Sequence, residues 1–419
     1  MSAFVYTNGK LGAEGVTFAD VARTFGTPCY VYSRAAIEKQ WTALHNAVGT
    51  HDHLICYAVK ANSSLAILNI LARLGSGFDI VSAGELQRVI KAGGDTRKVV
   101  FSGVGKREDE LEFALDHEIK CFNIESLAEL SRLNKIATRT KNRAAVSLRV
   151  NPDIDVATHP YIATGLKENK FGIPHTEVFA IYKQATGMDY IDITGIDCHI
   201  GSQIMNLDSF TDALDRLAEL IDALERKGVE LQHIDVGGGL GIQYHDEIPP
   251  SIEEYARVIL EHLGDRKKQL VIEPGRCITG NAGVLLTRVE YLKQTTHRNF
   301  AIVDAAMNDL LRPALYDAWH DILPVDEGGG RKRAVMTYDV VGPVCESGDF
   351  LGRERKLAID EGDLLAVCSA GAYGFVMSSN YNSRPRACEV MIDKGKAYEI
   401  RKRETLKELF AGESVLPVD

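Results

Sequence analysis

The sequence has no dense block of lysine and arginine, no apolar run of membrane-spanning length and no cysteine pair at CxxC spacing. Its 48 basic and 58 acidic residues give a formal charge of −10, so we expect neither nucleic acid nor an anionic membrane as a partner. The opening residues, MSAFVYTNGK, lack the basic and apolar regions of a secretory signal. These absences predict a protein of the cytoplasm.

The eight cysteines are scattered along the chain, at positions 29, 56, 121, 198, 277, 345, 368 and 388. Disulfide frameworks and structural zinc sites need cysteines at recurring short spacings. We therefore expect neither a disulfide framework nor a metal site. The composition, 45% hydrophobic and 25% charged over 419 residues, instead predicts two or three ordered domains with a large core.

Eight short apolar or β-branched runs alternate with helical patterns before residue 280. The predicted strands are 53–60, 77–82, 98–103, 119–126, 144–152, 193–202, 233–241 and 270–276. Helical periodicity lies near 64–75, 84–93, 107–118, 126–139, 175–187, 208–228 and 251–264. Because parallel neighbours need a crossover connection, this alternation predicts a parallel (β/α)8 barrel. An open doubly wound sheet is the alternative.

The pattern at both ends of the chain differs from that of the predicted barrel. The helical stretch 34–48 precedes the first strand, and we expect it to supply the eighth outer helix. After residue 280, β-rich runs are separated by Gly, Pro and charged turns with little helical period. We therefore predict a barrel domain over 30–280 and a mostly antiparallel β domain formed by 1–29 with 281–419.

Polar residues and glycines gather where the predicted barrel strands end, whereas the strand interiors look almost wholly apolar. Barrel active sites are built from the loops that follow the strands. The candidates are Lys60, Asp79, Ser82, Ser102, Glu125, Ser126, Arg149, Asn151, His199, Ser202, 237–239 and 273–276. Solvent at the strand ends is enough to explain Ser102 and Ser126, but it explains neither the glycines nor the lysine.

Lys60 follows the apolar run CYAV, which directs its amine toward the mouth of the predicted barrel. Among apolar walls a lysine loses solvation of its charged form, so its pKa falls and the amine becomes a usable nucleophile. The structural alternative is a strand-end lysine that reaches out to solvent. Lys167 and Lys170, in the stretch GLKENKFGIP, are competing candidates.

Glycines stand at the ends of two successive predicted strands, in DVGGGLG (235–241) and EPGR (273–276). Glycine lets backbone N–H groups close on a phosphate, and the loops after strands seven and eight often hold one. A carboxylate at Glu273 suits a cationic ring nitrogen, and an imidazole at His199 suits stacking on a flat ring. With a nucleophilic lysine, this set is typical of a pyridoxal phosphate site. A structural ion pair for Glu273 and a buried hydrogen-bonded role for His199 are the alternatives.

Several segments resemble the alanine-racemase-fold decarboxylases that use pyridoxal phosphate and act on ornithine, diaminopimelate or arginine. These segments are YAVKAN (57–62), GFDIVSAGEL (77–86), HIGSQ (199–203), DVGGGLG (235–241) and EPGR (273–276). Three later segments are similar to the diaminopimelate decarboxylases of that group: AAMNDLLRPALYDAWH (305–320), GPVCESGDF (342–350) and SAGAYGFVMSSNYNSRPR (369–386). The resemblance covers nearly the whole chain and implies a fold type III pyridoxal phosphate enzyme.

The resemblance also implies roles for individual residues. Lys60 would form a Schiff base with the cofactor, His199 would stack on its ring and Glu273 would bond the ring nitrogen. The implied phosphate ligands are Ser202, Gly239, Gly275 and the backbone of Arg276. For the substrate, the implied ligands are Arg276, Arg312 and Tyr316 at the distal carboxylate and Glu346 at the distal ammonium, with Tyr373 touching cofactor and substrate. Cys345 would be the proton donor.

The family further implies a homodimer with shared active sites, in which Cys345 and Glu346 come from the partner subunit. The implied reaction turns meso-2,6-diaminopimelate into L-lysine and CO2, the last step of lysine biosynthesis. A carboxylate at Glu273 fits this reaction, because a nearby anion keeps the ring nitrogen protonated and so favours decarboxylation. Without the resemblance, Cys345 looks like a small buried residue and Arg312 like a surface arginine.

Three other functions stay open at this point. Ornithine or arginine would be the substrate of a related decarboxylase on the same fold, but either would bring a cation to the arginines that suit a carboxylate. A non-catalytic carrier of pyridoxal phosphate needs only the barrel and its lysine. A Schiff-base aldolase is also a barrel with a reactive lysine.

Overall fold

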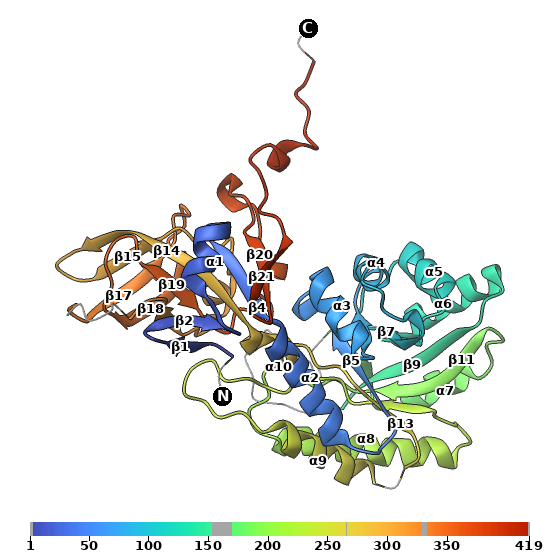
Figure 1. Ribbon diagram of the computed structural model, residues 1–419. Helices are drawn as coiled ribbons and strands as arrows, with labels where there is room; N and C mark the ends of the chain where they lie inside the picture. The colour runs from blue at the N-terminus through green and yellow to red at the C-terminus, as the bar shows by residue number, and fades with distance from the viewer. Residues whose placement is uncertain (1–2, 153–169, 265, 328–332, 418–419) are drawn as a thin grey trace. The chain divides into compact units, whose positions relative to one another are not determined.

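The computed structural model describes residues 3–152, 170–264, 266–327 and 333–417 (Figure 1). The chain divides into two compact units. The first unit contains Met1–Ile37, Tyr244–Asp246 and Thr279–Asp419, and the second contains Glu38–Gln243 and Glu247–Ile278. Within the described ranges, no helix combines the length and apolarity that crossing a membrane requires.

Eight parallel strands close into a barrel in the second unit. Their order is β9-β11-β12-β13-β5-β6-β7-β8, and β8 pairs with β9 to complete the ring. All eight predicted strands are confirmed, as β5 (His53–Ala58), β6 (Gly77–Ile80), β7 (Val99–Phe101), β8 (Cys121–Ile124), β9 (Ala144–Asn151), β11 (Ile191–Asp197), β12 (His233–Asp235) and β13 (Gln269–Ile272). The closed ring excludes the open doubly wound sheet. A short strand, β10 (Ile173–Pro174), also pairs with β9.

Helices follow the barrel strands, and all except the last, four-residue helix lie on their outer side (Figure 1). They are α3 (Leu65–Arg73), α4 (Ala83–Lys91), α5 (Glu108–Asp116), α6 (Leu127–Thr140), α7 (Val178–Ala185), α8 (Asp208–Arg226), α9 (Ile252–Leu263) and the short α10 (Arg276–Thr279). The helix predicted over 34–48 is present as α2 (Arg34–Val48), whereas its role as the eighth outer helix stays a prediction. His45 Nδ1 of α2 lies 2.9 Å from His53 Nε2 at the start of β5.

Side chains inside the barrel form an apolar layer and, closer to the strand ends, a polar layer. The apolar cluster consists of Cys56, Val100, Cys121 and Val271, from four different strands. A side chain two residues further along a strand faces the same side. Ser102, Asn123 and Glu273 therefore point inward as well, and hydrogen bonds join all three.

The expectation of almost wholly apolar strand interiors is wrong. Eight polar residues within the barrel strands are buried, namely Asp79, Asn123, Ser147, Arg149, Asn151, Asp197, His233 and Asp235. They occupy inward-facing positions, where side chains must fill the barrel. The apolar residues that alternate with them face the surrounding helices, and these dominate the sequence pattern. The polar layer is where the candidate site lies.

The first unit is built on a mostly antiparallel sheet in the order β18-β17-β15-β14-β4-β20-β21, with β19 pairing β14 and β16. Its strands are β4 (Cys29–Ser33), β14 (Gly283–Gln294), β15 (Asn299–Val303), β16 (Ile322–Pro324), β17 (Met336–Val341), β18 (Phe350–Leu357), β19 (Leu364–Val367), β20 (Cys388–Asp393) and β21 (Lys396–Arg401). The N-terminal strand β4 lies between β14 and β20, so the N-terminal stretch joins this sheet as expected.

A smaller three-stranded sheet and two helices complete the first unit. The sheet contains β1 (Val5–Thr7), β2 (Lys10–Ala13) and β3 (Val16–Thr17), and the helices are α1 (Phe18–Phe25) and α11 (Arg312–Tyr316). Phe18, Val31, Val284, Leu286 and Val390 belong to the apolar core of this unit. The mostly antiparallel β architecture predicted for this region is therefore confirmed.

Candidate active site

Lys60 lies in the turn after β5, and its amine binds a buried carboxylate. Lys60 Nζ lies 2.6 Å from Asp79 Oδ2 on the neighbouring strand β6. The side chain of Lys60 is 36% exposed, whereas that of Asp79 is fully buried. The amine is thus held at the barrel mouth by a carboxylate, and not among apolar walls as the sequence predicted. Of the competing lysines, Lys170 places its Nζ 5.3 Å from the centroid of the Phe171 ring, and Lys167 lies outside the described residues.

Glu273 directly follows β13, and its carboxylate is buried in the barrel. Ser102 Oγ and Asn123 Nδ2 donate to Glu273 Oε1 at 3.3 and 3.4 Å. Ser102 therefore belongs to the site, and attributing it to solvent exposure was wrong. Ser126, by contrast, has a structural role, because its Oγ accepts from Glu129 N at the start of α6.

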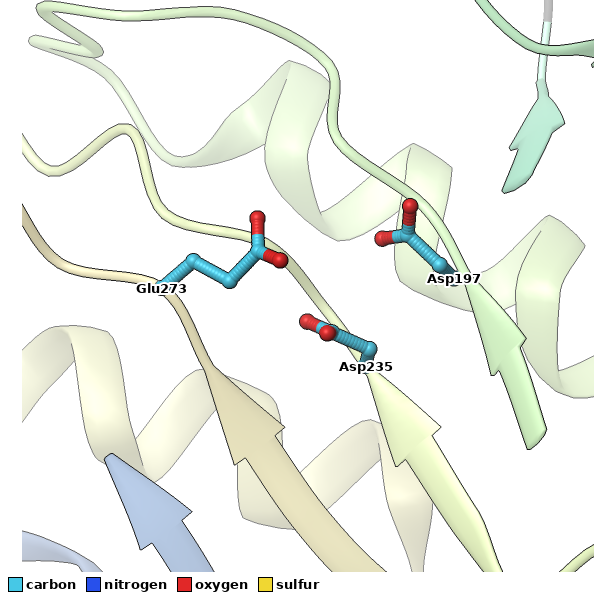
Figure 2. A group of neighbouring side chains, drawn as sticks. All are labelled: Asp197, Asp235 and Glu273. Atoms are coloured by element: carbon cyan, nitrogen blue, oxygen red, sulfur yellow. The ribbon is translucent and has the colours of Figure 1, made fainter. Parts of the chain in front are cut away.

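Glu273 is one of three neighbouring buried carboxylates. Figure 2 shows Asp197, Asp235 and Glu273 at the ends of β11, β12 and β13, with their carboxyl groups directed into a common space. One oxygen from each lies within 4.8 Å of the other two. Parallel pairing explains this arrangement, since Asp197 and Asp235 are register partners and Glu273 N donates to Gly237 O at 2.7 Å.

Burial and mutual repulsion make it costly to ionise this cluster fully. Loss of solvation raises the pKa of all three carboxyls, that of Asp235 to about 6 and those of Asp197 and Glu273 well above their usual range. The negative charge of Asp235 raises the pKa of Glu273 further, whereas the nearby Lys60 lowers it. The cluster therefore needs either bound protons or a cation that enters from outside the chain.

The two cations that face this part of the barrel already have carboxylate partners. Lys60 pairs with Asp79, and Arg149 Nη1 lies 2.8 Å from Glu125 Oε1. Arg149 Nε is also 3.9 Å from Asp197 Oδ2. In the part of the chain that the structure describes, no ion pair joins Asp235 or Glu273 to a lysine or arginine.

His199 follows β11, and a backbone hydrogen bond fixes its ring. Gly238 N donates to His199 Nδ1 at 3.1 Å, so the neutral ring carries its proton on Nε2. Burial, and then the charges of Arg149 and Lys60, lower the pKa of His199 well below its usual value. A flat, neutral ring in a fixed orientation is suited to stacking on a planar ligand.

The predicted phosphate ligands lie together at the ends of β11, β12 and β13. Arg276 Nη2 donates to Ser202 Oγ at 2.9 Å. Gly239 has a φ of +108°, and a Cβ there would lie 2.5 Å from Gly201 O. A Cβ on Gly275 would lie 2.9 Å from Ala61 Cβ, beside the turn that carries Lys60. Only glycine fits these two positions, so the backbone is left uncovered where an anion can approach it.

Arg312 begins α11 in the first unit and is buried, so the alternative of a surface arginine is wrong. Its guanidinium carbon lies 4.5 Å from the centroid of the Tyr244 ring, and its Nη1 lies 2.9 Å from His320 Nε2. His320 Nδ1 donates to the carbonyl of Cys368 at 2.8 Å, which leaves Nε2 to accept from Arg312. Tyr316, at the other end of α11, is half-buried.

Cys345 and Glu346 are exposed in a turn of the first unit, so the alternative of a buried cysteine is also wrong. The buried Asp349 holds this turn, because its carboxylate accepts from Val344 N at 2.8 Å. Cys345 N donates to Asn382 Oδ1 at 2.9 Å. The backbone of the turn is thus fixed, while the thiol faces solvent. Tyr373 is half-buried and has a left-handed φ of +55°.

Known proteins match this chain over nearly its whole length. The family described as "Pyridoxal-dependent decarboxylase, pyridoxal binding domain" matches residues 34–280. A diaminopimelate decarboxylase of Vibrio cholerae is 59% identical over 98% of both chains, and one of Pseudomonas aeruginosa is 58% identical over 100% of both. The chain belongs to the pyridoxal-dependent decarboxylase family, as one of its diaminopimelate decarboxylases.

Solved structures of this family share the fold. Diaminopimelate decarboxylase of Helicobacter pylori, complexed with L-lysine, is 41% identical with a TM-score of 0.91 and covers 94% of this chain and 98% of its own. The enzyme of M. jannaschii, in co-complex with L-lysine, is 34% identical with a TM-score of 0.94, covering 99% and 98%. These pyridoxal phosphate enzymes support the fold type III assignment.

The residues of the barrel fit the cofactor that the family implies. The glycine cradle of Gly239 and Gly275 is open to an anion, and Ser202 and Arg276 supply polar groups beside it. Glu273 is a buried carboxylate that pairs with no lysine or arginine within the described ranges, which suits a protonated ring nitrogen. Pyridoxal 5'-phosphate carries both a phosphate and such a nitrogen.

Sequence reasoning missed three polar residues that surround Glu273: Asn123, Asp197 and Asp235. Asp197 and Asp235 are the last residues of β11 and β12, and Asn123 is the last but one of β8, so each lies two positions before a residue that was a candidate. A signal was present, because ITGID and HID both place an aspartate at the last inward-facing position of an apolar strand.

Proposed function

We propose that this protein decarboxylates meso-2,6-diaminopimelate to L-lysine and CO2 with pyridoxal 5'-phosphate as its cofactor. The observation that carries the proposal is the buried carboxylate of Glu273, which forms no ion pair with a lysine or arginine among the described residues. A carboxylate at the ring nitrogen keeps that nitrogen protonated and favours loss of CO2. The names of the relatives at 54–59% identity support the same reaction.

Lys60 would hold the cofactor through a Schiff base at the mouth of the barrel. When bound, the cofactor accepts the electron pair that CO2 leaves on Cα. We propose that Glu273 hydrogen-bonds the ring nitrogen and that His199 packs on the ring face. The phosphate would lie on Gly239, Gly275, Ser202 and the backbone of Arg276. The ion pair of Lys60 with Asp79 supports this assignment, because it aims the amine before the cofactor arrives.

For the far end of the substrate, we propose that Arg276, Arg312 and Tyr316 bind the second carboxylate. The buried guanidinium of Arg312 is oriented by Tyr244 and His320, which suits recognition of one fixed anion. Ornithine and arginine lack this carboxylate and would bring a cation to the guanidiniums. We propose that Glu346 binds the distal ammonium.

We propose that Cys345 gives the proton that replaces CO2 at Cα, and that Tyr373 touches both cofactor and substrate. We also propose a homodimer in which Cys345 and Glu346 complete the active site of the partner subunit. Their exposure on a turn with a fixed backbone supports that arrangement. A place in the cytoplasm and the domain limits 30–280 and 281–419 with 1–29 remain predictions from the sequence.

Release of CO2 from meso-diaminopimelate, ornithine and arginine, measured in parallel, tests the substrate. We expect turnover of meso-diaminopimelate alone, and equal or better turnover of ornithine would defeat the proposal. The absorbance spectrum tests the two other functions. A colourless protein would indicate an aldolase, and a coloured protein that releases no CO2 would indicate a carrier of the cofactor.

A further inference from the structure

Asp235 lies beside Glu273 and has no part in the functions proposed above. It is fully buried at the end of β12. Its Oδ1 accepts from Gly237 N at 2.9 Å, whereas its Oδ2 has no hydrogen-bond partner within the described ranges. A buried carboxylate oxygen without a donor is costly. A proton shared with the neighbouring carboxyl of Glu273 would supply the missing donor.

The charges that face this pair leave it strongly negative. Two cations stand against five carboxylates: Lys60 and Arg149 against Asp79, Glu125, Asp197, Asp235 and Glu273. The remaining titratable groups nearby, the imidazoles of His199 and His233, the thiols of Cys56 and Cys121 and the phenol of Tyr255, are uncharged because burial shifts their pKa values toward the neutral form. Three negative charges are therefore left over in a dry interior.

We propose that Asp235 is a positioning residue that holds one proton jointly with Glu273 until the cofactor binds. Once a protonated ring nitrogen lies against Glu273, both carboxyls are ionised and together retain the proton on that nitrogen. The displaced proton goes to solvent if the ring arrives protonated, and to the ring nitrogen if it arrives neutral. This inference rests on the proposed role of Glu273.

Asp197 differs from Asp235 although both belong to the same cluster. Arg149 Nε lies 3.9 Å from Asp197 Oδ2, so a cation of the chain partly balances its charge. Asp235 forms no ion pair with a lysine or arginine in the described part of the chain, so its charge acts on Glu273 and on the ring nitrogen with less compensation. Like charges about 5 Å apart in a protein shift a pKa by about one to two units. The two aspartates are therefore a matched pair for a test.

The test compares Asp235→Asn, Asp197→Asn and Glu273→Gln holoenzymes with the unaltered protein. Each is reconstituted with pyridoxal phosphate that carries 15N in the ring, and the nitrogen chemical shift is followed against pH. Asp235→Asn should lower the pH at which the ring nitrogen loses its proton by about one to two units. Asp197→Asn should lower it by less than half of that, and Glu273→Gln should abolish protonation near neutral pH.

The outcomes separate this inference from the role of Glu273 itself. If Asp235→Asn titrates like the unaltered protein while Glu273→Gln does not, Asp235 is not a positioning residue but Glu273 keeps its role. If Glu273→Gln also titrates like the unaltered protein, the proposed role of Glu273 is wrong. Equal shifts for the two aspartate variants would also overturn the inference, because they would mean that Arg149 does not matter.

A second measurement covers the case in which Asp235→Asn does not fold. The unaltered apoenzyme is titrated calorimetrically in two buffers, with pyridoxal phosphate and with a deaza analogue that has carbon in place of the ring nitrogen. At a pH where the free ring nitrogen is protonated, pyridoxal phosphate should release one proton more than the analogue. Equal release would show that no shared proton is displaced.

Discussion

The candidate residues of the barrel and those of the first unit are held in opposite ways. In the barrel, Glu273, Arg149 and Asp79 are buried and bonded to side chains that follow other strands. In the first unit, Cys345 and Glu346 expose their side chains on a turn whose backbone is fixed by Asp349. Contacts within one chain thus fix the side chains of these barrel residues, whereas the side chains of Cys345 and Glu346 point to solvent. This difference is expected if the barrel binds the cofactor and the turn serves a second subunit.

Lys60→Ala should have the largest effect, and it tests the proposed attachment of the cofactor in the barrel. Without its amine the cofactor has no covalent attachment, and we expect turnover to fall by roughly three orders of magnitude or more. Borohydride reduction followed by peptide mapping should label Lys60 in the unaltered protein and nothing in the variant. Lys170→Ala is the control, because Lys170 competes with Lys60 in sequence alone. A label on Lys170 would refute the assignment.

Cys345→Ala tests the exposed turn. We expect the variant to keep its bound cofactor and its absorbance, because no barrel contact changes, and to lose about 10²- to 10⁴-fold in turnover as a proton donor is removed. The matched control is Cys368→Ala, a half-buried thiol of the same unit, which should retain turnover. Unchanged CO2 release by Cys345→Ala would remove the proton-donor role.

Mixing the two inactive variants asks whether the turn serves a partner subunit. In a dimer of one Lys60→Ala and one Cys345→Ala chain, one site receives both an intact lysine and an intact cysteine, provided that the cysteine comes from the partner. We therefore expect unfolding and refolding the variants together to restore measurable turnover. If each site takes both residues from one chain, the mixture stays inactive. Sedimentation or light scattering should report a dimer independently.

The barrel was more predictable from the sequence than the first unit. Most barrel strands are short, largely apolar runs followed by an amphipathic helix, so two periodicities mark most boundaries. In the first unit, β18 shows no such pattern, because its sequence, FLGRERKL, carries four charged residues in succession and only one of them, Arg355, is buried. A strand at the edge of the sheet that is rich in charged residues carries little apolar alternation.

The candidate site was predictable where a residue type is unusual for its position and unpredictable where contacts decide its role. Lys60 and the glycines at 237–239 stand out after apolar strands. Asp235 does not, because its importance comes from the neighbouring β13, which brings Glu273 beside it. The same holds for Arg312, whose guanidinium packs on the ring of Tyr244, far away in the sequence. Such side-chain neighbours follow from the tertiary structure and not from any local pattern.

Arg312→Lys tests substrate recognition and should have a smaller effect than the losses above. Lysine keeps the charge but cannot present a planar pair of donors or stack on Tyr244 in the same way. We expect kcat/KM for meso-diaminopimelate to fall by about 10- to 100-fold, mainly through KM. Cofactor absorbance should not change. A fall in kcat at constant KM would instead assign Arg312 to the chemical step.

Asp309→Asn tests how the first unit responds to pH. Burial raises the pKa of Asp309 to about 7, although Ala306 N–H donates to its carboxylate and opposes the shift. The folded protein therefore binds a proton between about pH 4 and 7 that the unfolded chain has lost, so this group lowers stability as pH rises through that range. The variant should gain stability over the unaltered protein as pH rises, by up to about 4 kcal/mol above pH 7.

Denaturant unfolding of the apoprotein at pH 5 and pH 8 measures this difference in stability between the variant and the unaltered protein. An equal difference at both pH values would contradict the prediction.

The barrel contains a group, His233, whose effect on stability changes with pH in the opposite direction. Burial lowers the pKa of His233 to about 3, so its contribution is present above about pH 6.5 and is lost as pH falls toward 3. As pH falls, His233 should therefore lower the stability of the barrel, whereas protonation of Asp309 should raise the stability of the first unit.

Removing one helix cap from each unit should have the smallest effects and would show whether the units unfold separately. Thr17 Oγ1 accepts from Asp20 N at the start of α1, and Ser251 Oγ accepts from Glu254 N at the start of α9. Thr17→Ala and Ser251→Ala should each cost about 1 kcal/mol, and Ser251→Gly, as the control, only a few tenths. Because the two caps belong to different compact units, each variant should shift a different calorimetric transition. If both variants shift one common transition equally, the two units unfold as one cooperative structure.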